Sequence, residues 1–165
     1  MWCKKCNRET NSGICELCGT PTEQDIPVLV YWCQDCKTPI IKPSDRIDKN
    51  ICPICGKETK YMCADLRPVF PEERLLVEIL LAKPFAFADK TVWASNNRYY
   101  IDGKPKALTG SAYKKYTPEY ITKELNANKD KNNYDVFNQT IDRFVLANKE
   151  RLNYLFDEAT DFIRD

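Results

Sequence analysis

Four Cys-x-x-Cys pairs near the start of the chain constrain its fold more than any other feature. They are Cys3/Cys6, Cys15/Cys18, Cys33/Cys36 and Cys52/Cys55. Two thiolates that are two residues apart can hold one metal ion from the same side, and a second, facing pair completes a tetrahedron of four sulfurs. The spacings C-x2-C-x8-C-x2-C and C-x2-C-x15-C-x2-C therefore predict two tandem four-cysteine zinc ribbons, each with one structural zinc ion.

The ligands of each ion are expected to follow the order of the chain. One ion would be held by Cys3, Cys6, Cys15 and Cys18, and the other by Cys33, Cys36, Cys52 and Cys55. Gly19 and Gly56 follow the last cysteine of each set, where the turn requires unusual dihedral angles, whereas Asn7 and Lys37 follow the first pairs. Each predicted set of four cysteines is thus followed by a glycine, and this repetition favours the sequential scheme. An interleaved cross-brace, in which the first and third pairs share a metal, is the alternative.

Other chemistry for these cysteines is less consistent with the pattern. A thioredoxin-type redox motif occurs once beside a βαβ pattern, whereas this chain has four copies, and nine cysteines cannot all pair in disulfides. Iron in a rubredoxin-like site is the alternative metal, because four sulfurs also suit iron. Four cysteine ligands leave no open position for water or substrate, so bound zinc would be structural, whereas iron would make the chain a rubredoxin-like electron carrier.

The remaining composition excludes several functions. The chain contains no histidine, which removes His-dependent catalysis and mixed Cys/His metal sites. Its formal charge of +1 falls to about −3 with eight thiolates and two zinc ions, which argues against a strongly cationic nucleic-acid binder. No apolar run is long enough for a membrane span, and the N-terminal residues do not form a signal peptide. A reducing, cytoplasmic location is therefore expected.

The ribbons are expected to occupy residues 1–66. Strands are predicted from Ile26 to Trp32, leading into the third cysteine pair, and from Lys60 to Cys63, leaving the fourth. Cys63 is interpreted as a small buried residue on that last strand, since no histidine is present to activate it as a reactive thiol. Residues 66–71, with two prolines, are expected to form a hinge.

The middle segment, residues 67–133, is expected to combine helices with a β-hairpin. Pro71 suits the first position of a helix that Lys83-Pro84 ends. A strand is predicted over Val92–Ser95, followed by a hairpin with strands 98–101 and 104–108 and an Asp102-Gly103 turn. Pro105 restricts the second hairpin strand to a sheet edge. The aromatic residues here could stack on nucleic-acid bases or serve simply as core residues.

Residues 111–116 are expected to form a basic, polar loop. Thr117 is a candidate N-cap, and with Pro118 it predicts a short helix that extends to about Asn128. Residues 126–133 are rich in Asn, Lys and Asp and are expected to form an exposed connector.

The final segment, residues 134–165, has the longest helical periodicity. Its apolar positions run from Tyr134 to Ile163, with Asn148 the one polar residue among them, and predict a single amphipathic helix of about 30 residues and 45 Å. Phe162 and Ile163 still lie on the apolar stripe at the end of this sequence. Two interpretations follow: a terminal helix packed on its own domain, or a helix that leads toward a further domain.

These features together resemble a known family. Besides the cysteine pairs, the segments DLRPVFPEER (65–74), VWASNNRYYIDGK (92–104) and NKERL (148–152) are similar to the N-terminal region of prokaryotic phosphoadenosine phosphosulfate reductase family proteins. The resemblance implies a small metal-bound α+β fold, followed by a nucleotide-binding PP-loop domain with an S-G-G-K-D-S motif. That motif is absent here, so no catalytic or cofactor-binding residue is assigned. The resemblance further implies that the complete protein is a reductase or a sulfurtransferase-like enzyme.

Two functions are therefore expected for this chain. The first is a zinc-binding, noncatalytic N-terminal module that positions a substrate, a partner protein or RNA for the catalytic domain, with contact through the last helix. The second is a stand-alone zinc-ribbon adaptor that binds protein or nucleic acid through a basic face of Lys104, Lys106, Lys114 and Lys115. Independent catalysis by this chain is not expected, because the sequence has no histidine, phosphate loop or open metal site.

Overall fold

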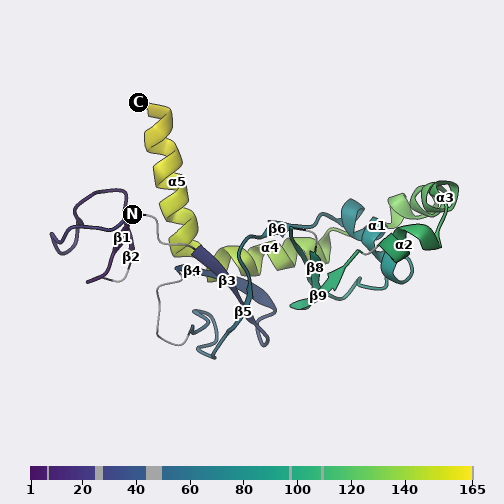
Figure 1. The fold of residues 1–165 in the computed structure, drawn as a ribbon, viewed down its shortest axis with the longest axis horizontal. Coiled ribbons are helices and arrows are strands. Elements are labelled where there is room, and N and C mark those ends of the chain that lie inside the picture. Colours follow the sequence, from purple (N-terminus) through teal and green to yellow (C-terminus); the bar gives the residue numbers. More distant parts are fainter. Residues whose placement is uncertain (7, 25–27, 44–49, 97, 109, 165) are drawn as a thin grey trace.

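Three small antiparallel sheets and a series of helices make up the computed structural model (Figure 1). The structure describes residues 1–6, 8–24, 28–43, 50–96, 98–108 and 110–164. The strands are β1 (Trp2–Cys3), β2 (Arg8–Glu9), β3 (Val28–Cys33), β4 (Thr38–Pro43), β5 (Lys60–Cys63), β6 (Arg67–Pro68), β7 (Val92–Ser95), β8 (Arg98–Ile101) and β9 (Lys104–Ala107). The helices are α1 (Pro71–Leu81), α2 (Gly110–Lys115), α3 (Pro118–Asn128), the 3-10 turn η1 (Lys129–Lys131), α4 (Asp135–Ala147) and α5 (Lys149–Arg164). The architecture is thus a mixed α+β one, as the sequence predicts.

The predicted strand before the third cysteine pair is the centre of the second sheet, which has the order β4-β3-β5. Strand β3 pairs along its whole length with β4, from Val28 opposite Pro43 to Cys33 opposite Thr38. The prediction is confirmed over residues 28–32, and Ile26 lies outside the described residues. Because β4 is an edge strand, its outward backbone groups need partners from elsewhere in the chain.

The third sheet has the order β6-β7-β8-β9, and its two faces contact different parts of the molecule. Trp93 and Tyr100 pack on one face with Val30, Trp32 and Met62 of the second sheet. The other face carries Val92, Ala94 and Ile101, which pack against Val77 of α1. Successive residues of a strand point to opposite faces, so the continuous burial of Val92–Ser95 follows from a sheet that is covered on both sides.

The predicted hairpin and its edge strand are confirmed. Asp102 and Gly103 form the turn with φ angles of 48° and 79°, and β9, which contains Pro105, pairs with β8 at the edge of the sheet. The predicted helix from Pro71 is also confirmed as α1. On α1 the buried carboxylate of Glu78 accepts a hydrogen bond from the backbone N–H of Phe87 at 2.7 Å, which holds the loop after the helix against it. Burial raises the pKa of Glu78.

The prediction of a polar loop over residues 111–116 is wrong. Residues Gly110–Lys115 form the short helix α2, and α3 follows after Thr117, whose side chain accepts a hydrogen bond from the backbone N–H of Tyr120. The rings of Tyr116 and Tyr120 stack at 4.9 Å between α2 and α3. Six residues are too few for a clear amphipathic period, so this helix leaves little signal in the sequence.

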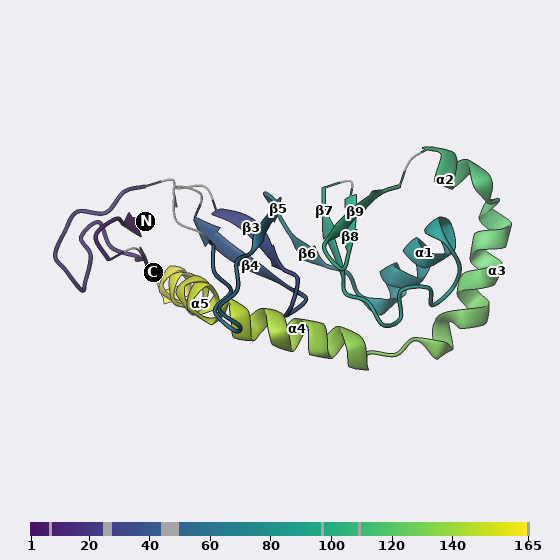
Figure 2. The same cartoon turned by 90° about the horizontal axis from the view of Figure 1, so that it is seen from below.

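The prediction of one uninterrupted final helix is also wrong. The helix divides at Asn148, where φ is −117° and ψ is 22°, into α4 and α5. In Figure 2, α4 runs along the β3–β4 region toward the α1–α3 end of the molecule, and α5 turns out of that line. Helix α4 packs on the second and third sheets through Phe144, whose ring lies 5.1 Å from that of Trp93. Helix α5 contains no buried residue within its described length.

Candidate metal centres

Eight of the nine cysteines form two groups that could each hold a metal ion. The first group is Cys3, Cys6, Cys15 and Cys18, and the second is Cys33, Cys36, Cys52 and Cys55, with the sulfur atoms of each group within 4.8 Å of one another. Each group consists of two consecutive Cys-x-x-Cys pairs, which is the arrangement of the sequential scheme and not that of the cross-brace. We name them the first centre and the second centre.

The sulfur spacing fits tetrahedral coordination. The Sγ–Sγ distances are 3.5 Å for Cys3–Cys18, 3.6 Å for Cys33–Cys55 and 3.8 Å for Cys36–Cys52. Four sulfurs at about 2.3 Å from one zinc ion lie about 3.8 Å from each other. A disulfide would need about 2.05 Å, and all nine cysteines are free in the structure. The donor set therefore fits a metal such as zinc.

The turns that carry the second pair of each centre have the same backbone hydrogen bonds. The N–H of Cys15 donates to Thr20 O and that of Cys52 to Lys57 O, both at 2.8 Å. Gly19 and Gly56 take φ angles of 69° and 74° in these turns. Such positive angles favour glycine because it lacks a Cβ.

The turn after the first pair of the second centre reaches the same region of dihedral space without glycine. Lys37 takes a φ angle of 53° there, although it carries a side chain. The corresponding Asn7 of the first centre lies outside the described residues. Lys37 therefore adopts the positive φ angle that glycine takes in the other turns, and its side chain makes this conformation strained.

Hydrogen bonds to sulfur favour the thiolate form that binds metal. The hydroxyl of Thr20 lies 2.5 Å from Cys18 Sγ, and together with the Thr20 backbone N–H it lowers the pKa of Cys18 to about 6. The N–H of Cys6 lies 3.4 Å from Cys3 Sγ, and that of Cys36 lies 3.4 Å from Cys33 Sγ. The backbone hydrogen bond lowers the pKa of Cys3, whereas burial outweighs it at Cys33 and raises the pKa of that thiol.

Cys63 belongs to neither centre. It lies on β5, is buried with Val30 and Met62, and donates a hydrogen bond to Asp65 O at 2.9 Å. Burial raises the pKa of Cys63, which disfavours the reactive thiolate. The structure agrees with the interpretation of Cys63 as a packing residue.

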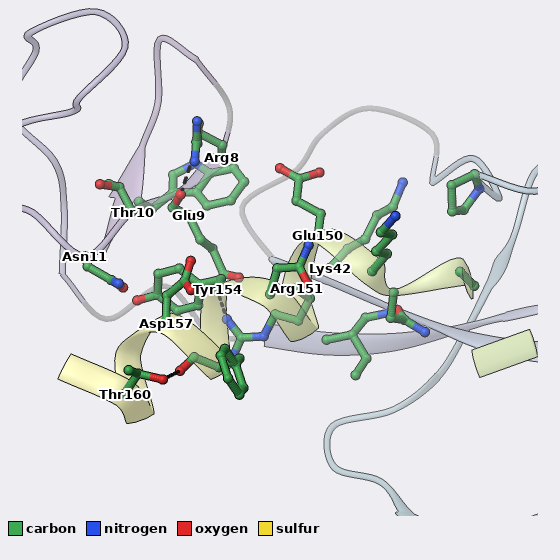
Figure 3. Close-up of a pocket in the computed structure, with 18 of the residues that line it drawn as sticks. Arg8, Glu9, Thr10, Asn11, Lys42, Glu150, Arg151, Tyr154, Asp157 and Thr160 are labelled. Carbon is green, nitrogen blue, oxygen red and sulfur yellow. Dashed lines mark hydrogen bonds and ion pairs between the residues drawn. The ribbon is translucent and has the colours of Figure 1, made fainter. Parts of the chain in front are cut away.

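A cleft of about 1120 Å³ lies between the first centre and the α4–α5 bend (Figure 3). Arg151 of α5 points toward Glu9 of β2 and forms an ion pair with it, and Tyr154 OH accepts a hydrogen bond from the Met1 amino group at 3.2 Å. The cleft lining contains five basic and five acidic side chains, so its charge is balanced. This balance favours neither an anionic nor a cationic ligand.

Sequence reasoning did not identify Asn148 as a structural contact. Its side chain is 3% exposed and accepts a hydrogen bond from the N–H of Ile41 at 2.7 Å. It also donates to Pro39 O and Phe144 O, both at 2.9 Å. The available signal was a single polar residue in an apolar stripe, because a buried polar side chain requires partners.

The candidate nucleic-acid residues divide between core and surface. Trp93 and Tyr100 are buried, as expected for core residues, and Tyr99 OH donates to Glu73 at 2.8 Å. Lys104 and Lys106 lie on the exposed edge strand β9, and Lys114 and Lys115 lie in the last turn of α2. The buried rings are thus unavailable for base stacking.

Comparison of the chain with models of protein families, with curated proteins and with solved structures gave no significant match. Among the described helices, none is both long enough and apolar enough to cross a membrane.

Proposed function

We propose that this chain is a zinc-stabilised, noncatalytic docking module. In this proposal, the first and second centres each bind one structural zinc ion, and α5 contacts another protein domain. Following the sequence resemblance, that domain is the nucleotide-binding domain of a phosphoadenosine phosphosulfate reductase-like enzyme. The module would position a substrate or partner for that domain.

The observation that carries the proposal is the uncovered apolar stripe of α5. It consists of Leu152, Leu155, Phe156, Ala159, Phe162 and Ile163, which share one helix face at spacings of three and four residues. We call it the α5 stripe. Phe156, Phe162 and Ile163 are 72%, 84% and 82% exposed. Covering each of these side chains would contribute about 1.5–3 kcal/mol, and exposed apolar patches of this kind mark interaction sites.

The charges on the rest of α5 favour a protein over a membrane as the occupant. Outside the α5 stripe, the helix carries three basic residues and four acidic ones, which are Lys149, Arg151, Arg164, Glu150, Asp157, Glu158 and Asp161. Helices that lie on anionic membranes carry mainly Lys and Arg on their polar face. Apolar anchors at helical spacing are instead typical of a helix that binds in a groove of another protein.

The two zinc ions would serve stability and not chemistry. Each centre provides four sulfur ligands, so a bound ion would have no open position for substrate. The ribbons around them are small, and a segment of about 65 residues buries so little apolar surface that its stability without metal is marginal. Structural zinc supplies roughly 10–16 kcal/mol to such folds.

Hydrogen exchange tests the docking role. The amides of residues 155–164 are expected to exchange rapidly in the isolated, zinc-loaded chain, and slowly in the native assembly purified from source cells. Phe156→Ser with Phe162→Ser should abolish that protection, whereas Asn153→Ser, on the polar face, should keep it. Equal exchange in the isolated chain and in the native assembly would refute docking through α5.

A stand-alone adaptor that binds nucleic acid is the second candidate. It is favoured by the exposed edge strand β9, on which all four residues are exposed, Lys104 and Lys106 among them. Binding of single-stranded RNA should then weaken steeply with salt and be lost in Lys104→Glu with Lys106→Glu. Unchanged affinity in that double variant would exclude this surface.

A further inference from the structure

The α4–α5 bend is held by the edge strand of the second centre. The Asn148 amide pairs with β4 as a peptide group of a neighbouring strand would, accepting from Ile41 N and donating to Pro39 O. Strand β4 begins at Thr38, two residues after the metal-ligand candidate Cys36. The position of these backbone groups therefore depends on the turn that contains Cys36.

The α4–α5 bend is also part of a buried cluster that contains two cysteines of the second centre. Ala147, the last residue of α4, is buried in one cluster with Cys33, Cys52 and Ile40. Two ligand candidates of the second centre thus belong to the same buried cluster as the residue that precedes Asn148. A change in the spacing of those cysteines would alter the surface on which the bend packs.

The bent arrangement of α4 and α5 is an alternative to one straight helix over the same residues. The hydrogen bonds Asn148 N to Phe144 O and Leu152 N to Asn148 O, at 3.0 and 2.9 Å, continue on both sides of the bend. The apolar periodicity also runs through this position without a change of phase. Without the contacts to β4, the chain can therefore continue as one helix, as its sequence predicts.

The segment that carries the first centre forms an ion pair and a hydrogen bond with α5 beyond the bend. Arg151 pairs with Glu9, and Tyr154 contacts Met1, but neither contact involves Ala147 or Asn148. These contacts therefore lie at a later turn of the helix than the bend. The cysteines of the second centre lie in one buried cluster with Ala147, where the bend forms.

From these contacts, we infer that Asn148 is a positioning residue that couples the second centre to the direction of α5. Metal at the second centre orders β4, β4 holds the Asn148 amide, and the amide holds the bend that directs the α5 stripe. Loss of that metal releases the bend and lets α4 and α5 align. The metal at the second centre and the consequence for docking both rest on the proposed function, whereas the contacts between Asn148 and β4 do not.

The test uses the full zinc-loaded chain and nuclear magnetic resonance. The readouts are the exchange rate of the Ile41 amide and the angle between α4 and α5 from residual dipolar couplings. Asn148→Ala should keep both zinc ions, accelerate Ile41 exchange at least about tenfold and change the angle. The control Asn153→Ala should change neither readout.

Cysteine variants then separate the two centres. Cys52→Ser with Cys55→Ser should release Ile41 and the bend, whereas Cys15→Ser with Cys18→Ser should leave Ile41 exchange within about threefold of wild type. If the second-centre variant unfolds, Asn148→Ala still tests whether the amide holds the bend, and removal of the remaining metal from the Cys15→Ser with Cys18→Ser variant by a chelator should accelerate Ile41 exchange.

Two results would overturn the coupling. One is an unchanged interhelical angle in Asn148→Ala, and the other is equal acceleration of Ile41 exchange by both cysteine variants. Failure of docking alone would look different, because Ile41 would respond as expected while residues 155–164 stayed unprotected in the native assembly.

Discussion

Gly103 lies directly against the indole ring of Trp32. A Cβ atom at Gly103 would be 2.5 Å from Trp32 Nε1, and the φ angle of 79° is itself unfavourable for a residue with a side chain. The contact brings the Asp102-Gly103 turn of the third sheet against a core residue of the second sheet. This close contact between the hairpin turn and Trp32 therefore restricts how the two sheets can pack against each other.

Gly103→Ala is expected to destabilise the zinc-loaded chain by about 3 kcal/mol, because it combines overpacking against Trp32 with backbone strain. The measurement is equilibrium denaturation followed by tryptophan fluorescence. Gly13→Ala is the matched control, since no atom lies within 4 Å of its added Cβ. A loss below about 1 kcal/mol for Gly103→Ala would show that the Trp32 contact is not tight.

Glu73 is expected to make stability depend on pH. Arg67 donates two hydrogen bonds to its carboxylate at 2.6 and 2.7 Å, and this ion pair, with Tyr99 OH, lowers the pKa of Glu73. A lowered pKa contributes stability above the unfolded-state value of about 4.3, and that stability is lost as pH falls through the folded-state value.

Glu73→Gln should therefore cost about 1 kcal/mol at pH 7, a modest value because Arg67 is half exposed. The difference between wild type and variant should shrink below about pH 4. Urea denaturation across this pH range measures it, with the exposed Glu16→Gln as control. A difference that stays constant from pH 7 to pH 3 would contradict the assigned ion pair.

Lys37 offers a stabilising substitution at the second centre. Its φ angle of 53° costs roughly 1–2 kcal/mol for a residue with a side chain, more than the entropy that glycine loses on folding. Lys37→Gly should therefore stabilise the zinc-loaded chain by about 0.5 kcal/mol. Gly56→Ala, at a φ angle of 74°, should destabilise it by about 1 kcal/mol. Effects of the same sign in both variants would contradict this account of the turns.

The elements that were predicted correctly are those in which a few neighbouring residues favour one backbone geometry. Pro71 begins α1, Thr117 caps α3, and Asp102-Gly103 forms the hairpin turn, because each of these residue types favours one backbone geometry. The cysteine spacing likewise predicted which sulfurs lie together, since a four-sulfur site needs two facing pairs.

Helix α2 was missed because it is short, whereas the other missed features involve contacts between distant residues. At the bend, Asn148 forms hydrogen bonds with Pro39 and Ile41, more than one hundred positions away in the sequence. Helical periodicity shows which face of a helix is apolar. It contains no information about hydrogen bonds between the helix and the edge of a distant strand. The pairing of Arg151 with Glu9 was not predictable for the same reason.

The most direct test of this account is the native mass of the chain purified under reducing conditions without added chelator. Zinc ligation by both centres predicts a mass that corresponds to one chain with two zinc ions, and no bound metal in the variant that combines Cys15→Ser, Cys18→Ser, Cys52→Ser and Cys55→Ser. Iron in place of zinc, fewer than two metal ions per chain, or disulfides within the two groups would contradict it.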